Sequence, residues 1–394
     1  MDKKNLKVSR EKLLKPVRRV VVKVGSGVLT TKNGLNRRVI ADLSDDICAL
    51  RKKRMEVILV SSGAIASGLK KIGLDRRPES ISHQQAVAAV GQSSLMMAYE
   101  GAFGRYGQKV AQILITRDDL NHRGRYLNAR NTLFILLSWK IVPIVNENDT
   151  VVVDEIKFGD NDNLSAMVTN LTESHLLVNL TDIDGLFDKD PRSHKDACLI
   201  GVVEKVNDEV MKYASTIPGF LGRGGMVSKI RAVQRVAMGG VPAIVANGLK
   251  RHVLKNIFMG QEEGTLFMPQ DAPLCSRKHW IAFTKSPKGE IIIDRGAEKA
   301  LMKRGKSLLP SGIMEVRGRF SLGDSVVLLN EENHELAVGM VNYHSRDIRK
   351  IIGLKSTEIK PRLGFKHDDE VIHRDNLVIT HEMEVGEDVC RLRA

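Results

Sequence analysis

The residues best suited to chemistry are crowded into one stretch, 146–165, which reads NENDTVVVDEIKFGDNDNLS. It follows the apolar run 141–145 and leads into the helix-like run 164–168. Open α/β sheets bind ligands beyond the carboxyl ends of their strands. A single aspartate here would be a turn residue or a helix cap, and Asp162 or Asn163 suits the cap. Two clusters of amides and carboxylates, one on each side of Lys157, instead predict a ligand site.

Two further lysines stand beside glycines. Lys23 ends the apolar run 19–24 and precedes Gly25 and Gly27, and Lys229 follows the glycine-dense segment 219–225. Glycines allow a ligand to approach the backbone closely. Taken alone, Lys23 is better explained as a strand-end lysine whose ammonium reaches solvent. Segment 219–229 matches neither the Walker phosphate loop nor the dinucleotide fingerprint, so its own motif signal is weak.

Small and polar residues close two more apolar runs. Run 56–60 ends in Ser61, Ser62 and Gly63 and turns directly into a helix. Open N–H groups at such a helix start suit an anion, although close packing of strand and helix explains the small residues equally well. Run 176–180 ends in Thr181 and Asp182 in the same manner.

Strand-like and helix-like segments alternate through the first two thirds of the chain. The apolar strands carry no polar alternation, which is typical of strands buried on both faces of a parallel sheet. Their alternation with helices favours a wound α/β sheet with right-handed crossovers. The predicted strands are 19–24, 56–60, 110–115, 141–145, 176–180 and, as the last of the domain, 242–248. The predicted helices include 37–51, 83–99 and 230–238, with others starting near 64, 126 and 164.

The pattern changes near residues 264–267, and the prolines of 269–273 indicate a linker. Strands at 289–294 and 325–329 around one helix at 297–304, with recurring glycines, predict a small β-rich barrel. The 394 residues therefore divide into a basic leader 1–16, an α/β domain 17–268, a linker 269–276, a β-rich domain 277–380 and a mobile tail 381–394.

The net charge of +14 raises the question of nucleic-acid binding. Residues 1–275 hold 40 Lys and Arg against 29 Asp and Glu, or +11, whereas residues 276–394 hold 21 against 18, or +3. A lysine-rich first domain that handles several anionic groups explains this surplus equally simply.

Cysteine spacing and hydropathy indicate a cytoplasmic protein. The four cysteines, Cys48, Cys198, Cys275 and Cys390, form no C-x-x-C pair, which argues against a zinc site or a disulfide framework. The basic leader has no apolar core, so it does not resemble a signal peptide. No apolar run reaches the roughly 18 residues of a membrane span.

The motifs, taken in order, resemble those of bacterial glutamate 5-kinases in the amino-acid kinase family. The resemblance covers residues 17–379, and 276–380 is similar to a PUA domain, of which 308–313 is typical. It implies a three-layer αβα sandwich with a mostly parallel central sheet, followed by a small β-rich PUA barrel. The segments that carry it are 22–26 (VKVGS), 61–66 (SSGAIA), 146–149 (NEND), 156–165 (IKFGDNDNLS) and 224–229 (GGMVSK).

The resemblance implies a reaction in which the γ-phosphoryl group of ATP moves to the side-chain carboxylate of L-glutamate. The product, an acyl phosphate, starts proline synthesis, and the resemblance also implies feedback inhibition by proline. Because the substrate carboxylate attacks directly, catalysis reduces to positioning and charge neutralisation. Mg²⁺ would bind mainly through phosphate oxygens and water.

The resemblance assigns roles residue by residue. Catalysis falls to Lys23, Lys229 and Asp162, and glutamate binding to Ser62, Asp149, Asn161 and Asp160. The nucleotide site comprises Lys23, Thr181, Asp182, Arg223, Gly224, Gly225, Met226, Val227, Ser228 and Lys229. Many relatives carry Thr where this chain has Arg223, so a hydroxyl contact is replaced here by an arginine that could reach a phosphate.

The sequence leaves open which partners the protein has and which acceptor it uses. The resemblance implies a homodimer or homotetramer and raises the question of contact with a glutamyl-phosphate reductase. RNA binding by the PUA-like segment is a competing role, as is a different carboxylate or carbamate acceptor. Phosphate contacts dominate RNA affinity, so a segment with a charge of only +3 favours a structural or regulatory role for that domain.

Overall fold

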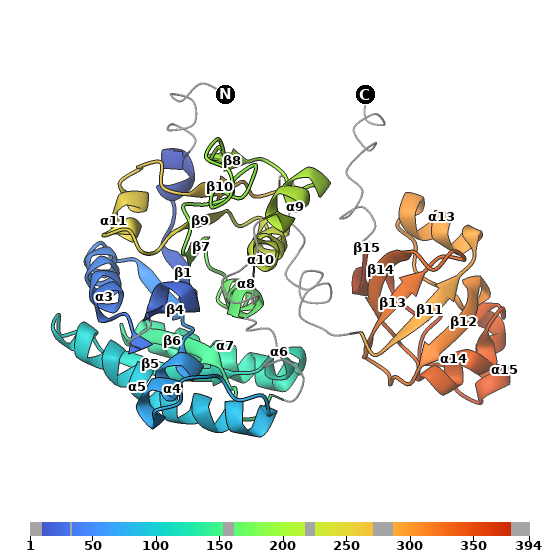
Figure 1. The fold of residues 1–394 in the computed structure, drawn as a ribbon. Helices are drawn as coiled ribbons and strands as arrows, with labels where there is room; N and C mark the ends of the chain where they lie inside the picture. Colours follow the sequence, from blue (N-terminus) through green and yellow to red (C-terminus); the bar gives the residue numbers. More distant parts are fainter. Residues whose placement is uncertain (1–9, 32–33, 153–160, 217–224, 271–286, 380–394) are drawn as a thin grey trace. The chain divides into compact units, whose positions relative to one another are not determined.

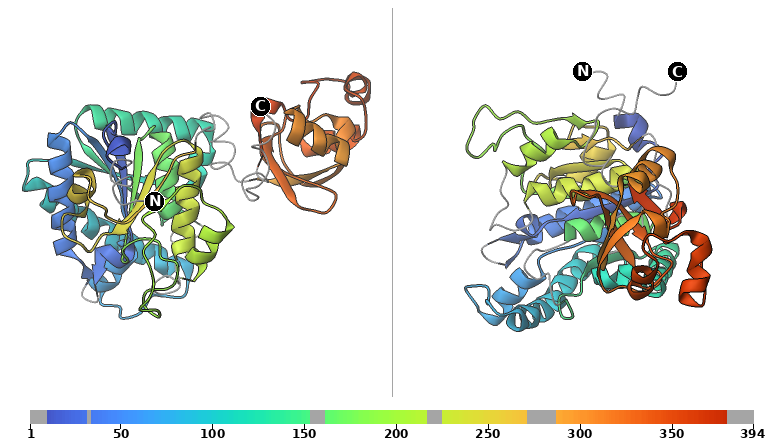
Figure 2. Two further views of the ribbon diagram at one scale, coloured as in Figure 1. Left: turned by 90° about the horizontal axis from the view of Figure 1, so that it is seen from above. Right: turned by 90° about the vertical axis from the view of Figure 1, so that its right-hand side faces the viewer.

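A computed structural model describes residues 10–31, 34–152, 161–216, 225–270 and 287–379 (Figure 1). Contacts within the chain divide it into two units, Met1–Pro273 and Leu274–Ala394, shown from two further sides in Figure 2. In the ranges just given, no helix is long and apolar enough to cross a bilayer.

The first unit is built on an eight-stranded sheet in the order β5-β6-β4-β1-β7-β9-β10-β8. Every neighbouring pair is parallel except β9 with β10. The mostly parallel sheet is therefore confirmed, but 242–248 is not its last strand, because the short β10 follows. The strands are β1 Arg19–Val24, β4 Glu56–Val60, β5 Val110–Ile115, β6 Val142–Glu147, β7 Leu176–Thr181, β8 Val202–Val203, β9 Ala243–Asn247 and β10 Thr265–Phe267.

Helices cover both faces of this sheet, which gives the three-layer αβα sandwich (Figure 1). One apolar cluster joins the sheet to α3, α5 and α11, and a second joins its other face to α7, α8, α9 and α10. The helices are α2 Ser26–Leu29, α3 Arg37–Lys52, α4 Ala64–Ile72, α5 Ile81–Gly104, α6 Arg117–Asn121, α7 Arg123–Ser138, α8 Asn161–Leu171, α9 Asp208–Ser215, α10 Met226–Met238 and α11 Val253–Phe258. A small hairpin pairs β2 Thr30–Thr31 with β3 Gly34–Leu35.

Helix α3 shows how local sequence sets these boundaries. The Asn36 side chain accepts a hydrogen bond from the backbone N–H of Val39 and so caps the first turn. Arg51 and Lys52 lie in the last turn, where cations favour the helix dipole. Apolar residues at helical spacing between these ends face the first cluster. The predicted helix 37–51 is thus confirmed almost to the residue.

Strand β1 lies in the middle of the sheet and determines where Lys23 points. Val20 and Val22 belong to the first apolar cluster, and Val21 belongs to the second. Since side chains alternate along a strand, Lys23 lies on the same face as Val21, beneath α8. Its register neighbours are Val60 on β4 and Asn179 on β7.

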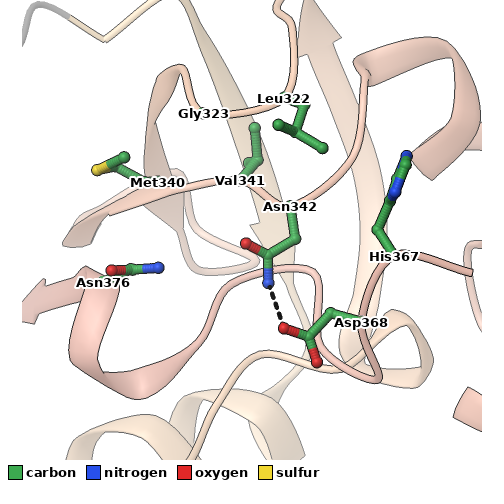
Figure 3. A pocket seen from close by; sticks show the side chains of 8 residues that line it. All are labelled: Leu322, Gly323, Met340, Val341, Asn342, His367, Asp368 and Asn376. Atoms are coloured by element: carbon green, nitrogen blue, oxygen red, sulfur yellow. Dashed lines mark hydrogen bonds between the residues drawn. The ribbon is translucent and has the colours of Figure 1, made fainter. Parts of the chain in front are cut away.

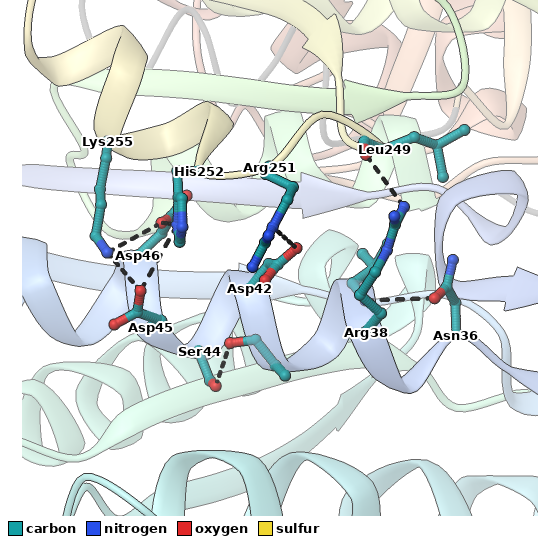
Figure 4. A network of polar contacts seen from close by, with 12 residues as sticks. Asn36, Arg38, Asp42, Ser44, Asp45, Asp46, Leu249, Arg251, His252 and Lys255 are labelled. Carbon is teal, nitrogen blue, oxygen red and sulfur yellow. Dashed lines mark hydrogen bonds and ion pairs between the residues drawn. The ribbon is translucent and has the colours of Figure 1, made fainter.

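A polar network ties α11 to α3 (Figure 4). The buried Asp46 carboxylate lies 2.9 Å from His252 Nδ1 and accepts a 3.1 Å hydrogen bond from the backbone N–H of Leu254. Lys255 Nζ lies 2.5 Å from Asp45 Oδ2. The Lys255 ammonium lies near both the Asp45 and the Asp46 carboxylate and balances part of their charge. These contacts hold α11 against α3.

The second unit has a five-stranded sheet in the order β12-β11-β13-β14-β15, in which only β11 and β13 are parallel. It encloses its own apolar cluster. The expectation of one helix was incomplete, because α14 and α15 accompany α13. The elements are β11 Gly289–Ile293, α13 Arg295–Arg304, β12 Ile313–Gly318, β13 Ser325–Leu329, β14 Glu335–Met340, α14 Ser345–Ile351, α15 Ile359–Leu363 and β15 Leu377–Ile379.

Helices α4 and α5 approach each other at two glycines. A Cβ atom added to Gly91 would lie 1.8 Å from the carbonyl oxygen of Ala64, and one added to Gly68 would lie 1.9 Å from that of Val87. Both distances are far inside van der Waals contact with backbone atoms, which cannot rotate away. The interface therefore depends on the missing side chains.

We predict that Gly91→Ala lowers the free energy of unfolding by about 1–3 kcal/mol or more, because the methyl group forces two backbones apart. The matched control is Gly101→Ala on the same helix, where an added Cβ meets nothing within 4 Å. That variant should gain up to about 1 kcal/mol from helix propensity. Urea unfolding measures both, and equal midpoints for the two variants would contradict the packing argument.

Candidate active site

The centre of the site is one carboxylate held between two ammonium groups. Lys23 Nζ lies 2.5 Å from Asp162 Oδ1, and Lys229 Nζ lies 3.3 Å from Asp162 Oδ2. Their side chains are 5%, 10% and 4% exposed for Lys23, Lys229 and Asp162 respectively. The three residues come from β1, α10 and α8, so the fold joins positions that lie far apart in the sequence.

Two neutral donors complete the shell around Asp162. Ser228 Oγ donates to Oδ2 at 2.6 Å, and Asn179 Nδ2 donates to Oδ1 at 3.1 Å. Each carboxylate oxygen therefore receives one ammonium and one neutral donor. A carboxylate with this many partners has its orientation fixed by the surrounding structure.

The electrostatics of this cluster favour an anionic ligand. Burial alone would raise the pKa of Asp162, but Lys229 and Lys23 outweigh it and hold that pKa well below its ordinary value. Burial lowers the pKa of Lys23, and the attraction of Asp162 opposes this shift. When both ammonium groups are charged, the three side chains of Lys23, Asp162 and Lys229 together carry one net positive charge, and Asp182 adds a weaker attraction on Lys23. Buried charges require partners, and an anion such as a phosphate supplies one.

A chain of amides lies beside the charged cluster. Asn161 Nδ2 donates to Ser62 Oγ at 3.0 Å and to Asn146 Oδ1 at 3.1 Å, and Asn146 Nδ2 donates to Gln92 Oε1 at 2.8 Å. Asn161 Oδ1 and Gln92 Nε2 are buried without a partner in the part of the chain that is described. Unsatisfied buried polar atoms are uncommon, and here they offer one acceptor and one donor to a ligand.

Asp149 follows β6 at the same end of the sheet and is half-buried. Burial raises the pKa of its carboxyl to about 6. Among the described residues, no counter-charge contributes to that shift. The group is therefore a carboxyl that an incoming cation would stabilise in its ionised form.

Three of the predicted nucleotide-site residues, Lys23, Thr181 and Asp182, lie at the ends of β1 and β7. Thr181 Oγ1 donates to Asp182 Oδ1 at 3.0 Å. A Cβ atom on Gly27 would lie 3.4 Å from Asp182 Cγ, and one on Gly25 would lie 3.6 Å from Lys23 Nζ. The glycine turn after β1 therefore brings bare backbone close to both a lysine ammonium and a carboxylate.

The other predicted residues divide into two groups. Gly225 precedes α10, where Met226 is buried in the second apolar cluster and Val227 packs against it. Asp160, Arg223 and Gly224 lie outside the described residues. The capping prediction for Asp162 or Asn163 was wrong, because α8 already begins at Asn161.

Sequence reasoning missed three polar residues that the fold brings into the site. Asn179 interrupts the otherwise apolar run 176–180, and this interruption was a signal that could have been used. Asn146 belongs to the polar stretch first singled out but was given no role of its own. Gln92 carries no local signal, because it sits among small residues of a long helix and meets Asn146 only through the fold.

The second unit has a separate pocket of about 350 Å³ (Figure 3). Its lining includes the apolar side chains of Met340 and Val341 and the polar side chains of Asn342, His367 and Asp368. Asn342 Nδ2 donates to Asp368 Oδ2 at 3.3 Å. The Asp368 carboxylate in the lining would repel a phosphate group, so the pocket does not favour RNA binding.

Comparisons with known proteins agree with this geometry. The model of the amino acid kinase family matches residues 18–247, and that of the PUA domain matches residues 289–363. A glutamate 5-kinase of Geobacter sulfurreducens is 51% identical over 94% of this chain and 100% of its own length. One of Geobacter metallireducens is 52% identical with the same two coverages. A solved UMP kinase from Bacillus anthracis, 18% identical, covers 66% of this chain and 98% of its own with a TM-score of 0.43, which is too remote to bear on the site.

The kinase-domain match spans more than half of the chain, and the two curated relatives align along their whole length. These matches cover all the described residues of the charged cluster and of the amide chain. The chain therefore belongs to the amino acid kinase family and, within it, to the glutamate 5-kinases that carry a PUA domain.

Proposed function

We propose that this protein transfers the γ-phosphoryl group of ATP to the side-chain carboxylate of L-glutamate, the first step of proline synthesis. The observation that carries the proposal is the buried Lys23–Asp162–Lys229 cluster, in which one carboxylate holds two ammonium groups. The names of the relatives, which are glutamate 5-kinases at about half identity along the chain, support the choice of acceptor.

The reaction needs no nucleophile from the protein. A glutamate carboxylate oxygen attacks the γ-phosphorus, the bond to the bridging β–γ oxygen breaks, and ADP leaves. Glutamate is ionised at neutral pH, so no proton has to be removed. Lys23 and Lys229 would neutralise charge on the transferring and leaving phosphates from two sides, and Asp162 would hold both ammonium groups in place.

Magnesium ion is part of the proposal through the nucleotide. The Asp162 oxygens are already occupied by ammonium, amide and hydroxyl donors, so that carboxylate is not free to ligate a metal. Mg²⁺ keeps several waters and binds phosphate oxygens readily, so a site with few protein ligands fits it. When bound with the nucleotide, the ion would offset part of the negative charge of the phosphates.

The amide chain and Asp149 would bind glutamate. Asn161 and Ser62 present polar atoms beside the charged cluster, and Asp149 offers the negative charge that an α-ammonium requires. Thr181 and Asp182, together with 223–229, would contact the nucleotide. In this proposal the glutamate carboxylate and the γ-phosphate would meet at the two lysines, in the alignment that in-line transfer needs.

The wider setting belongs to the same proposal. We place the enzyme in the cytoplasm as a homodimer or homotetramer, inhibited by proline as the end product of its pathway. Its labile acyl phosphate would pass to a glutamyl-phosphate reductase, by direct contact or by diffusion. These features are supported only by the relationship to glutamate 5-kinases.

An acceptor panel tests the proposed reaction. With ATP and Mg²⁺, ADP release should depend on L-glutamate and remain near background with aspartate, N-acetylglutamate or carbamate. A coupled assay for ADP measures this, and an added series with L-proline reports inhibition. Turnover with one of the other acceptors alone would show that the acceptor has been assigned wrongly within the family.

Removing either charge partner should slow the chemical step more than it weakens glutamate binding. For Lys229→Ala and Asp162→Ala we expect kcat to fall on the order of 10²–10³-fold, with the glutamate KM changing much less. Steady-state kinetics measures this split. Lys52→Ala, an exposed lysine at the end of α3, is the control and should keep its kcat. A near-normal kcat in either site variant would refute the assigned roles.

The raised pKa of Asp149 predicts a pH dependence of glutamate use. Below pH of about 6 the free enzyme holds a neutral carboxyl, which cannot balance an α-ammonium. The kcat/KM for glutamate should then fall about tenfold per pH unit, although the substrate carboxylate, with a pKa of about 4.3, remains ionised at pH 5–6. Asp149→Asn should have low kcat/KM at pH 8 and lack this fall. An unchanged pH profile in the variant would exclude Asp149 as its source.

A further inference from the structure

Asn179 is the one side chain of the charged cluster to which no role has yet been given. It lies on β7 in register with Lys23 on the neighbouring β1. The side chain is fully buried, at 0% exposure, and its Nδ2 donates to Asp162 Oδ1 at 3.1 Å. The same oxygen receives the Lys23 ammonium at 2.5 Å. Asn179 thus contacts the carboxylate on the side of one lysine only.

Asn179 is the one polar residue in the run from Leu176 to Leu180 of β7, which is otherwise apolar. Its neighbours along the strand, Leu177, Val178 and Leu180, are apolar and fully buried. A residue that only filled space in such a strand would be Leu or Val. An amide at this place loses its hydration on folding and must recover the cost through its contacts.

Those contacts satisfy only half of the amide. Asn179 Oδ1 is buried and has no hydrogen-bond partner in the described part of the chain. Turning the amide over would place this oxygen against the Asp162 carboxylate, where two negative atoms repel, so the orientation with Nδ2 on Asp162 is fixed. A purely structural asparagine is usually satisfied at both ends, and exceptions occur at functional sites.

The neutrality of this donor matters for the charge of the cluster. An amide holds the carboxylate by a hydrogen bond and adds no charge, so the surplus positive charge of the two lysines is retained for the phosphates. An aspartate of nearly the same shape would add a negative charge and cancel that surplus. A leucine would keep the cluster's charge but would leave Asp162 Oδ1 with Lys23 alone.

We propose that Asn179 is a positioning residue: its amide fixes the Asp162 carboxylate so that Lys23 and Lys229 stand at the separation that phosphoryl transfer requires. The inference rests on the proposed kinase reaction. Asn179 acts through Asp162 and need not touch either substrate. Ser228 performs the matching task on Oδ2, from α10.

Two substitutions of similar size separate positioning from charge. For Asn179→Leu we expect kcat to fall about tenfold to 10²-fold, because a misplacement on the order of 1 Å can cost that much, while both KM values change little. For Asn179→Asp we expect the affinity for a non-hydrolysable ATP analogue with Mg²⁺ to fall by about tenfold or more, since the cluster becomes neutral. Steady-state kinetics and isothermal titration calorimetry measure the two effects.

The matched control is Thr169→Val on α8. Thr169 is also fully buried, and its Oγ1 donates at 2.7 Å only to the carbonyl oxygen of Ser165 in its own helix. This variant removes a buried polar group from α8, the helix that carries Asp162, and should keep kcat within about twofold. Urea unfolding of all three variants shows whether a kinetic change merely follows lost stability.

The outcomes distinguish this inference from the function on which it rests. An unmodified enzyme without glutamate-dependent turnover contradicts the proposed reaction itself. If the unmodified enzyme is active, a near-normal kcat in Asn179→Leu, or a loss matched by Thr169→Val, overturns the positioning role. Should the leucine variant fail to fold, Asn179→Asp decides instead: unchanged analogue affinity together with unchanged kcat rejects the proposal.

Discussion

The candidate active site of the first unit depends on one buried carboxylate that lies between two ammonium groups. Without Asp162, Lys23 and Lys229 would repel each other at low dielectric, and each would carry an uncompensated desolvation cost. With it, the cluster holds together and still keeps one unit of positive charge. In the proposed reaction an anionic nucleotide would offset that charge, so the electrostatic balance that keeps the lysines together would also favour a phosphate ligand.

Regular elements of the fold carry this cluster. Lys23 and Asn179 lie in register on two central strands, and Asp162 and Lys229 lie on two helices that pack on the same face of the sheet. Sites on strands and helices are held more precisely than sites on loops. The proposed acceptor side is built differently, from a chain of amides that crosses from α8 through β6 to α5. Two amide atoms in that chain have no partner among the described residues, and they offer one acceptor and one donor.

Much of the fold could be predicted because its signals are local. The buried strands of the parallel sheet read as continuous apolar runs, and helices such as α3 have their apolar spacing and their cap in the sequence. The failures have physical causes. Strands β8 and β10 are two and three residues long, too short for any periodic pattern, and the helix α14 has only seven residues. Such pieces are stabilised by what they pack against.

The sequence by itself determined which chemical groups are present and in what order: two lysines beside glycines, a polar stretch after a strand, and small residues at a strand end. Those features singled out the segments, and the resemblance to glutamate 5-kinases assigned the roles of Lys23, Asp162 and Lys229. Only the tertiary structure decided that Asp162 faces both lysines instead of capping its helix, and that Asn179 and Gln92 belong to the site at all. The reason is that a hydrogen bond between residues 17 or 54 positions apart depends on strand register and helix packing, which no local pattern encodes.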